Sequence, residues 1–218
     1  MKTTLLSAIA ICLLTVTSCK KDKAETAGEA RDASAPSENA ETYNVNTSTS
    51  VIEWTGSKQV GKHSGTLRLS GGSIFAEGDQ VTGGNFTIDM NTISVSDLEG
   101  SDKADLEAHL KGLTMEKADH FFNVRKYPEA KFEITNVSTE TGKSSIEGNL
   151  TIKETTKNIK FPAIVNISDK SISITSDTFV IDRTEWRVNY GSKSVFTDLT
   201  DQFVNDEIEV RVVVKASR

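Results

Sequence analysis

From Tyr43 to the end of the chain, short segments alternate apolar and polar residues with a period of two. This period is typical of β-strands that bury one face and expose the other. No alternation of strands with long helices is present, as a parallel sheet would require. We therefore predict one all-β domain of antiparallel strands over residues 43–218. Residues that favour turns separate the segments at hairpin spacing, at Gly71 and Gly72, Gly78 and Asp79, Gly83 and Gly84, 140–142 and 168–170.

One segment interrupts this alternation with a helical pattern. Leu106 and Leu110 are four residues apart, which places them on the same face of a helix. Gly112 is placed to end that helix, and Thr114 is placed to begin a second short one. We expect one or two short helices near residues 98–122, inserted as a lid or plug over one end of the domain.

The predicted strands must protect their edges from pairing with other chains. Closure into a lipocalin-like antiparallel β-barrel removes the edges altogether. A barrel of about eight strands leaves an interior for side chains or for one small ligand. We predict such a barrel, and a two-sheet sandwich is the alternative that periodicity alone does not exclude.

The N-terminal segment has the features of a bacterial lipoprotein signal. Residues 5–16 are largely apolar, which is too short a run for a comfortable membrane span and typical of a signal peptide. Small residues then precede Cys19, as in a lipobox. We predict a signal peptide over residues 1–18 and an acylated Cys19. Because Lys20 rather than Asp follows it, we expect an outer-membrane lipoprotein that faces the periplasm or the cell surface.

Residues 19–42 contain the acylated cysteine and a segment rich in Ala, Glu, Ser, Asp and Gly. Such a composition buries too little apolar surface to offset the entropy of ordering. We therefore predict a disordered tether up to residue 42. The chain has two cysteines, Cys12 and Cys19. Removal of the first and acylation of the second leave the mature domain without disulfides or thiol chemistry.

Composition and motifs argue against several classes of function. The chain has 25 Lys and Arg against 31 Asp and Glu, giving a net charge of −6. Nucleic-acid binding needs clustered positive charge, so no nucleic-acid partner is expected. No glycine-rich phosphate loop of the Walker or dinucleotide type is present, so no cofactor is expected.

The three histidines do not form a recognisable catalytic or metal-binding motif. His63, His109 and His120 lie outside any Gly-x-Ser-x-Gly element. Asp105 with His109, and Glu116 with His120, are four residues apart and could share helix faces. Their spacing matches no defined metal site. We expect no catalytic residues and no metal, although a hydrolase on the same scaffold remains an alternative.

Several stretches occur in the order found in one known family. Residues 119–122 (DHFF) and 127–132 (YPEAKF) resemble the "D-x-F-F … Y-P-x-x-x-F" stretch of the YceI-like family. Residues 148–157 (GNLTIKETTK) resemble its "G-D-L-T-I-R-G-V-T-K" hairpin, and 181–186 (IDRTEW) its "F-D-R-T-x-F/W" strand. Residues 54–56 and 63–66, and residues 205–210 near the end, are similar to the first and last motifs of the family. The resemblance covers the whole predicted domain.

The chain departs from the family pattern at several motif positions. Asn149 stands in place of Asp, Lys153 in place of Arg and Glu154 in place of Gly. Trp186 and Arg187 stand where many members have an aromatic residue followed by Gly. These departures bear on the identity of any ligand more than on the fold.

The resemblance implies a lipocalin-like barrel that binds a long polyisoprenoid or quinone-like lipid and is not an enzyme. A structural or adhesion module with a filled core is the other alternative, and a homodimer is left open. Arg183 and Tyr190 could meet a polar headgroup, or Arg183 could pair with Asp182 or Glu185. The candidate lipid-binding residues are Phe86, Met90, Phe121, Phe122, Phe132, Leu150, Ile152, Phe161, Ala163, Phe179, Arg183, Trp186 and Tyr190.

Overall fold

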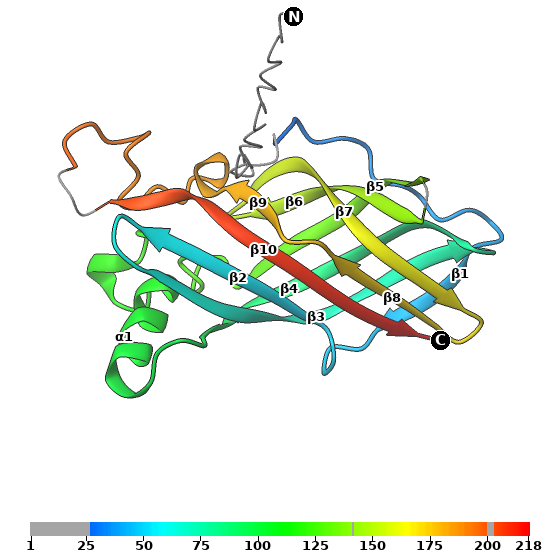
Figure 1. Ribbon diagram of the computed structural model, residues 1–218, viewed down its shortest axis with the longest axis horizontal. Coiled ribbons are helices and arrows are strands. Elements are labelled where there is room, and N and C mark those ends of the chain that lie inside the picture. The colour runs from blue at the N-terminus through cyan, green and yellow to red at the C-terminus, as the bar shows by residue number, and fades with distance from the viewer. Residues whose placement is uncertain (1–26, 141, 200–202) are drawn as a thin grey trace, which may run out of the picture.

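The computed structural model describes residues 27–140, 142–199 and 203–218, which form an antiparallel barrel (Figure 1). Eight strands form a closed ring in the order β10-β2-β3-β4-β5-β6-β7-β8, and β8 pairs with β10 to complete it. The ring strands are β2 (Val51–Lys58), β3 (Lys62–Glu77), β4 (Gln80–Val95), β5 (Glu129–Glu140), β6 (Lys143–Ile152), β7 (Thr155–Ser168), β8 (Ser171–Ser176) and β10 (Val204–Ser217).

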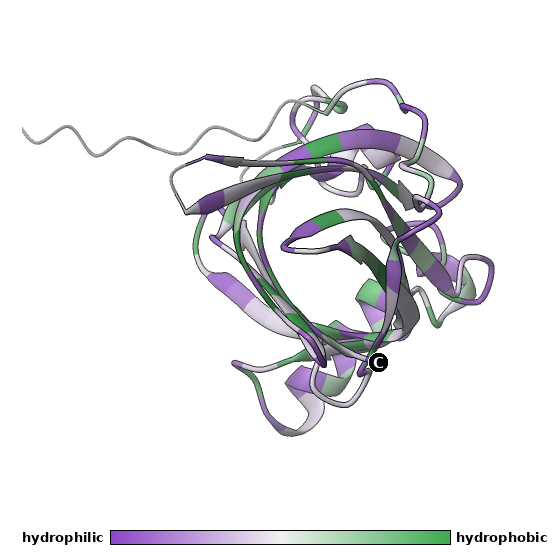
Figure 2. Ribbon diagram, turned by 90° about the vertical axis from the view of Figure 1, so that its right-hand side faces the viewer, coloured by the Kyte–Doolittle hydropathy of each residue, from purple (hydrophilic) through white to green (hydrophobic). Residues whose placement is uncertain are grey.

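Two further strands supplement the ring. β1 (Glu41–Val45) pairs with β3 and with the end of β10, and β9 (Phe179–Asp182) pairs with the first half of β10. Figure 2 looks along the barrel and shows the strands encircling one axis. The predicted lipocalin-like barrel is therefore confirmed, and the two-sheet sandwich is excluded because the hydrogen bonding between strands closes on itself.

The helical segment lies where it was expected. Helix α1 (Gly100–Lys111) ends at Gly112, whose φ of 67° is in the left-handed region that glycine adopts readily. A single 3₁₀ turn, η1 (Met115–Lys117), follows Thr114 in place of a second helix reaching Phe122. A second 3₁₀ turn, η2 (Arg183–Trp186), follows β9. Among the described residues, no helix is long and apolar enough to cross a membrane.

Two of the predicted turns are wrong. Gly71 and Gly72 lie inside β3, and Gly83 and Gly84 lie inside β4. Gly72 has a φ of 149°, and a Cβ atom there would lie 2.4 Å from the carbonyl oxygen of Asn85 on the neighbouring strand. These glycines permit irregular pairing and close backbone approach in long strands, which is a known role of glycine in sheets.

The two ends of the barrel differ in how they are filled. Buried side chains such as Tyr43, Ile74 and Ala216 pack where β1 pairs with β3 and β10. The hydroxyl of Tyr43 donates to the carbonyl of Ser168 at 3.3 Å and so ties β1 to the end of β7. Helix α1 lies at the opposite end of the barrel (Figure 1). One end is thus closed by the core, and the other is covered by a helix.

The segment before β1 is ordered where the structure describes it, so the prediction of a disordered tether is wrong for residues 27–42. Gly28 forms an antiparallel bridge with Asn158 on β7. The backbone of Arg31 donates to Asn149 Oδ1 at 3.0 Å and accepts from Asn149 Nδ2 at 2.6 Å. Ser34 N donates to the carbonyl of Ile134 at 2.9 Å. Polar side chains on the outside of the barrel hold this segment by its backbone, which does not require apolar residues.

Residues 1–26 lie outside the described part of the chain. The predicted signal peptide, the acylation of Cys19 and the first part of the predicted tether therefore remain predictions.

Candidate functional site

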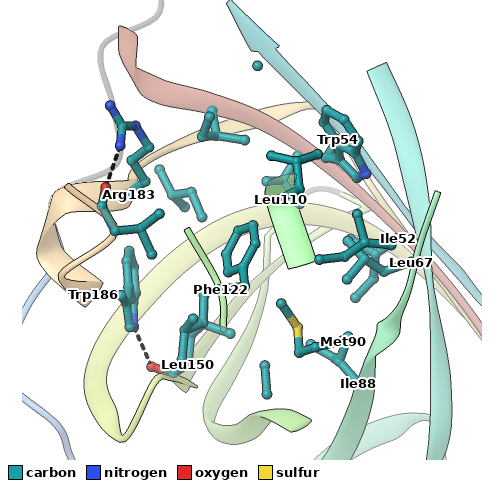
Figure 3. A pocket seen from close by; sticks show the side chains of 18 of the residues that line it. Ile52, Trp54, Leu67, Ile88, Met90, Leu110, Phe122, Leu150, Arg183 and Trp186 are labelled. Atoms are coloured by element: carbon teal, nitrogen blue, oxygen red, sulfur yellow. Dashed lines mark hydrogen bonds between the residues drawn. The ribbon is translucent and has the colours of Figure 1, made fainter. Parts of the chain in front are cut away.

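The barrel encloses a cavity of about 400 Å³ that begins at the α1 end and runs inward (Figure 3). This volume is within the range of roughly 300–1,000 Å³ that is usual for ligand pockets. Its inner wall is formed by alternate residues of the ring strands, as the period of two predicts. Phe86 on β4 lies opposite Phe132 on β5, which in turn lies opposite Leu150 on β6.

Aromatic rings form a continuous stretch of this wall. The ring of Phe132 lies 5.7 Å from that of Phe161, and Phe161 stacks on Phe179 with 4.5 Å between ring centroids. Gly148 makes room for Phe132, because a Cβ atom at that position would lie 2.2 Å from the ring. The glycine in the 148–157 motif therefore shapes the cavity rather than only the hairpin.

Twelve of the thirteen residues proposed as lipid-binding candidates lie on the cavity wall. Ala163 is the exception: it is buried, with 1% of its surface exposed, but it does not line the cavity. It pairs with Ser176 and Ser144 at the filled side of the barrel. The alternation predicted that Ala163 is buried. It did not show that packed side chains, rather than the cavity, occupy the interior of the barrel next to Ala163. The candidates on the wall are Phe86, Met90, Phe121, Phe122, Phe132, Leu150, Ile152, Phe161, Phe179, Arg183, Trp186 and Tyr190.

The polar groups of the cavity wall lie at the α1 end. Lys58, Lys62 and His63 come from the β2–β3 hairpin, His109 comes from α1, and Tyr190 comes from the loop after η2. The rest of the wall is apolar apart from Ser57 of the same hairpin, the indole N–H groups of Trp54 and Trp186, and Arg183, which uses its polar atoms elsewhere. The α1 end is therefore the mouth of the cavity.

Arg183 is buried, and its side chain forms its hydrogen bonds within the protein. Neither Asp182 nor Glu185, the two acidic neighbours in the sequence, pairs with it. Its guanidinium donates to the carbonyl oxygens of Val188, Val204 and Asn205. It also pairs with Asp206 at 3.2 Å between Nη2 and Oδ1. Burial lowers the pKa of this guanidinium, and the Asp206 carboxylate opposes that shift. Arg183 therefore holds β10 against the loop after η2.

Trp186 connects η2 to the cavity wall. It is fully buried, and its indole Nε1 donates to the carbonyl of Leu150 at 2.8 Å (Figure 3). An indole can be buried in this way because its one donor has an acceptor. The side chain of Asp182 accepts a hydrogen bond from Thr184 N and caps the 3₁₀ turn that places Trp186.

A cluster of aromatic and histidine rings covers part of the mouth. His109 Nε2 lies 2.9 Å from His120 Nδ1, and both rings contact Tyr190. Phe121 packs edge-on against His109, with 5.1 Å between the ring centroids. Burial, and then the nearby His120 and Lys117, lower the pKa of His109. Phe121 therefore covers this part of the mouth together with two histidines and a tyrosine.

A second, more polar recess of about 900 Å³ adjoins the mouth. It shares Tyr190 with the cavity, and its charged lining consists of the cations Lys126, Lys153 and Arg187 and the carboxylates Asp119 and Glu154. The Lys153 ammonium donates to the carbonyl of Phe121 at 2.9 Å, and burial lowers the pKa of this ammonium. Lys153 therefore links the β6–β7 turn to the segment that covers the mouth.

Part of a catalytic arrangement is present near the mouth, but it is incomplete within the described residues. His63 Nδ1 lies 2.9 Å from the carboxylate of Asp97, whose pKa is lowered despite burial by a hydrogen bond from Ser64 N and by His63. No hydroxyl in the described part of the chain is hydrogen-bonded to the other nitrogen of His63. A hydrolase triad needs such a nucleophile. Nor do the described residues bring three potential metal ligands together.

Sequence reasoning predicted Phe121, Phe122 and Tyr190 as binding residues but missed the histidine and lysine side chains at the mouth. The spacing of His109 indicates only a helix face shared with Asp105, and no motif singles out Lys58 or Lys62. Their signal in the sequence is weak because Lys58 ends β2, Lys62 begins β3 and His109 lies in the last turn of α1, where the period of two does not extend. Deeper wall positions such as Ile52, Leu67 and Ile88 were in phase with the predicted strands.

A ring of antiparallel strands that closes around an apolar cavity places this chain among the hollow single-chain β-barrels. Within that class, the model of the YceI-like domain matches residues 43–216, and the chain belongs to the YceI-like family. The motifs quoted from the sequence lie within that range.

Solved structures show the same fold. BcnA of Burkholderia cenocepacia aligns with a TM-score of 0.59 and 19% identity, covering 79% of this chain and 99% of that one. A polyisoprenoid-binding domain from Saccharophagus degradans, implicated in plant cell wall breakdown, aligns with a TM-score of 0.56 and 13% identity, covering 80% and 97%. No curated protein matches the chain significantly.

Proposed function

We propose that this protein is a membrane-tethered carrier that holds one long apolar lipid, a polyisoprenoid or quinone-like chain, in the barrel cavity. The observation that carries the proposal is the polarity of the cavity wall, which is apolar along its depth and polar at one mouth. Ligand pockets for apolar molecules have this arrangement. The neighbour from Saccharophagus degradans, described as polyisoprenoid-binding, supports the same class of ligand.

The energetics favour tight but reversible binding without catalysis. Burial of on the order of 600 Å² of lipid chain contributes roughly 15 kcal/mol at about 25 cal/mol per Å². The loss of translational, rotational and chain freedom offsets a large part of this gain. The lipid head would remain at the mouth, where Lys126, Lys153 and Arg187 line the polar recess. The protein would then store, shield or transfer the lipid rather than change it.

The tether is the second part of the proposal. Cys19 would carry the acyl chains after removal of residues 1–18, and two or more chains make anchoring stable where one is marginal. The barrel would then stand on the outer membrane. The opposing hypotheses are a hydrolase that uses His63 and Asp97, and a packed module without a ligand.

A matched pair of variants tests the lipid assignment. Ala130 lines the cavity opposite Ile88, whereas Ala163 is equally buried but lies off the cavity. Ala130→Leu adds the same volume as Ala163→Leu, but only the first narrows the cavity. Each protein is purified from membranes, its mass is measured under native conditions, and its lipids are extracted and identified.

We expect the unmodified protein and Ala163→Leu to carry a long prenyl lipid, and Ala130→Leu to have lost it. Ala163→Leu should lose about 1–3 kcal/mol of stability from overpacking. If Ala130→Leu retains the same lipid at the same stoichiometry, the lipid does not occupy this cavity. An unmodified protein that carries no lipid would favour the packed module.

A further inference from the structure

Apolar side chains that are exposed to solvent gather around the cavity mouth. Among the described residues, seven large apolar side chains are exposed, and Ile164 on the wall of β7 is the only one of them away from the mouth. The most exposed are Met115, with 88% of its surface exposed, and Val60, with 81%. We call the set at the mouth the apolar rim: Val60, Leu113, Met115, Tyr190, Val195 and Phe196.

The apolar rim comes from three separate parts of the chain. Val60 lies in the β2–β3 turn, Leu113 and Met115 follow α1, and the remaining three belong to the loop after η2. Neighbours of all three parts line the cavity or the polar recess, including Gly61, Leu110 and Phe196 itself. Figure 1 shows these three parts together at one end of the barrel. Three loops therefore present exposed apolar groups on the same face, which for a soluble surface indicates an interaction site.

The segment before β1 determines which end of the barrel would lie near the membrane when Cys19 is acylated. Gly28 pairs with Asn158, the fourth residue of the 14-residue strand β7. That strand begins at Thr155, which lines the recess beside the mouth. The segment then runs away from the mouth, past Ile134, to β1 at the filled end. The anchored part of the chain thus meets the barrel on its mouth side.

The length of chain between the anchor and this attachment point is short. Cys19 and Gly28 are nine residues apart in the sequence, and nine residues span at most about 30 Å when fully extended. A long disordered tether up to residue 42 would let either end of the barrel face the lipid. The attachment at Gly28 instead keeps the mouth side near the bilayer.

We infer that the apolar rim docks on the bilayer surface, so that the cavity mouth opens into the membrane that carries the anchor. Apolar side chains at such a rim enter the boundary between headgroups and acyl chains, as those of interfacial segments do. The lipid would then pass between membrane and cavity without crossing water. The orientation rests on the acylation of Cys19 and the purpose on lipid binding, which are the two parts of the proposed function, but the contact itself does not require a bound lipid.

Single cysteine labels on the anchored protein test the docking. With Cys19 acylated, a cysteine introduced at Met115, Val60 or Phe196 is the only free thiol of the mature chain. The matched control is Ile164→Cys, because Ile164 is an exposed apolar residue on the barrel wall. Each protein carries a nitroxide label and is reconstituted in vesicles of phosphatidylethanolamine and phosphatidylglycerol. Collisions with oxygen, which enters bilayers, are compared with collisions with a water-soluble nickel chelate.

We expect the ratio of oxygen to nickel collisions to rise severalfold at Met115, Val60 and Phe196 on reconstitution, and to stay unchanged at Ile164. The same rim labels on a chain that begins at Lys20, which has neither Cys12 nor the acylated Cys19, should stay in the soluble fraction and show the ratio of the wall control. A triple variant, Val60→Ser with Met115→Ser and Phe196→Ser, should lower the ratio of a label at Leu113.

Equal ratios at the rim and at Ile164 in vesicles would overturn the inference. If the collision ratio at the rim labels rises without vesicles and depends on protein concentration, the rim binds a second copy of the chain. That result would also overturn the inference. If the rim labels enter the bilayer while native mass measurement finds no lipid, the docking holds and the proposed function fails. If native mass measurement finds the lipid while the rim labels stay in water, the proposed lipid binding holds and the docking fails.

Discussion

His109 is the residue whose ionisation most directly affects the cavity mouth. Its ring lines the cavity, contacts Phe121 and Tyr190, and lies 2.9 Å from His120 between ring nitrogens. In that contact one nitrogen must donate and the other accept, so a second proton on both rings breaks it. Burial, together with the nearby His120 and Lys117, holds the pKa of His109 below its ordinary value.

This depressed pKa predicts a loss of stability in mild acid. The unfolded chain binds a proton at His109 near pH 6.5, before the folded chain does, so protonation favours unfolding. The contribution of neutral His109 to the free energy of unfolding is fully present above about pH 6.5 and is lost as the pH falls below that value. Urea unfolding of the protein from pH 7.5 to 5 should show this decline, and His109→Gln should flatten it. His63→Gln is the control, and an equal effect of both variants would contradict the assignment.

The β6–β7 hairpin is an element that carries backbone strain. Lys153 and Glu154 form its turn with φ values of 47° and 62°, in the left-handed region that hairpin turns of this kind require. Residues other than glycine, asparagine and aspartate adopt this region at a cost. The same turn places the Lys153 ammonium where it donates to the carbonyl of Phe121. This hydrogen bond supports the segment that covers the mouth.

Substitution of Glu154 by glycine should therefore stabilise the protein. Glycine at this position removes about 1 kcal/mol of left-handed strain, which urea unfolding would report as a higher free energy of unfolding. The control is Glu140→Gly, because Glu140 is exposed at the end of β5 and has no positive φ. There the same substitution should cost about 0.5–1 kcal/mol. Equal destabilisation by both variants would show that the turn is unstrained.

At the scale of the whole molecule, residues 27–40 form a strap across the outside of the barrel. It bridges β7 at Asn158, β6 at Asn149 and β5 at Ile134 before the chain enters β1. An ion pair between Arg31 and Glu147, 2.6 Å apart, lies beside these backbone contacts. The strap therefore spans three consecutive ring strands and adds to the direct pairing of β5 with β6 and of β6 with β7.

A chain that begins at Glu41 should consequently melt below one that begins at residue 20. The loss of a few hydrogen bonds, each worth about 1 kcal/mol, removes roughly 2–3 kcal/mol. For a domain of this size that corresponds to about 5–10 °C in melting temperature. Asn149→Ala should reproduce part of the shift in the longer chain and have a smaller effect in the shorter one. Equal melting temperatures of the two chains would show that the strap contributes nothing.

The alternation of apolar residues was enough to predict the strands and most of the cavity wall, and the helical spacing of Leu106 and Leu110 predicted the cover. The closed barrel was predicted from the need to protect strand edges and from the family resemblance, because alternation alone also allows a sandwich. Phe86, Phe132 and Leu150 could be placed on one face because a period of two is a local property of the backbone. Gly112 likewise ends α1 through its own conformational freedom. Such features depend on neighbours in sequence, so no knowledge of distant segments was needed.

Other features depend on contacts between distant segments. Ala163 has the alternation of a wall residue, but the level at which the core fills the barrel depends on β1, more than a hundred residues earlier in the chain. Arg183 pairs with Asp206 rather than with a sequence neighbour, and Asn149 binds the backbone of Arg31. Hydrogen bonds of this kind satisfy groups whose partners are brought together by the closure of the barrel. Their geometry is therefore a property of the folded chain, which residue type and spacing alone do not specify.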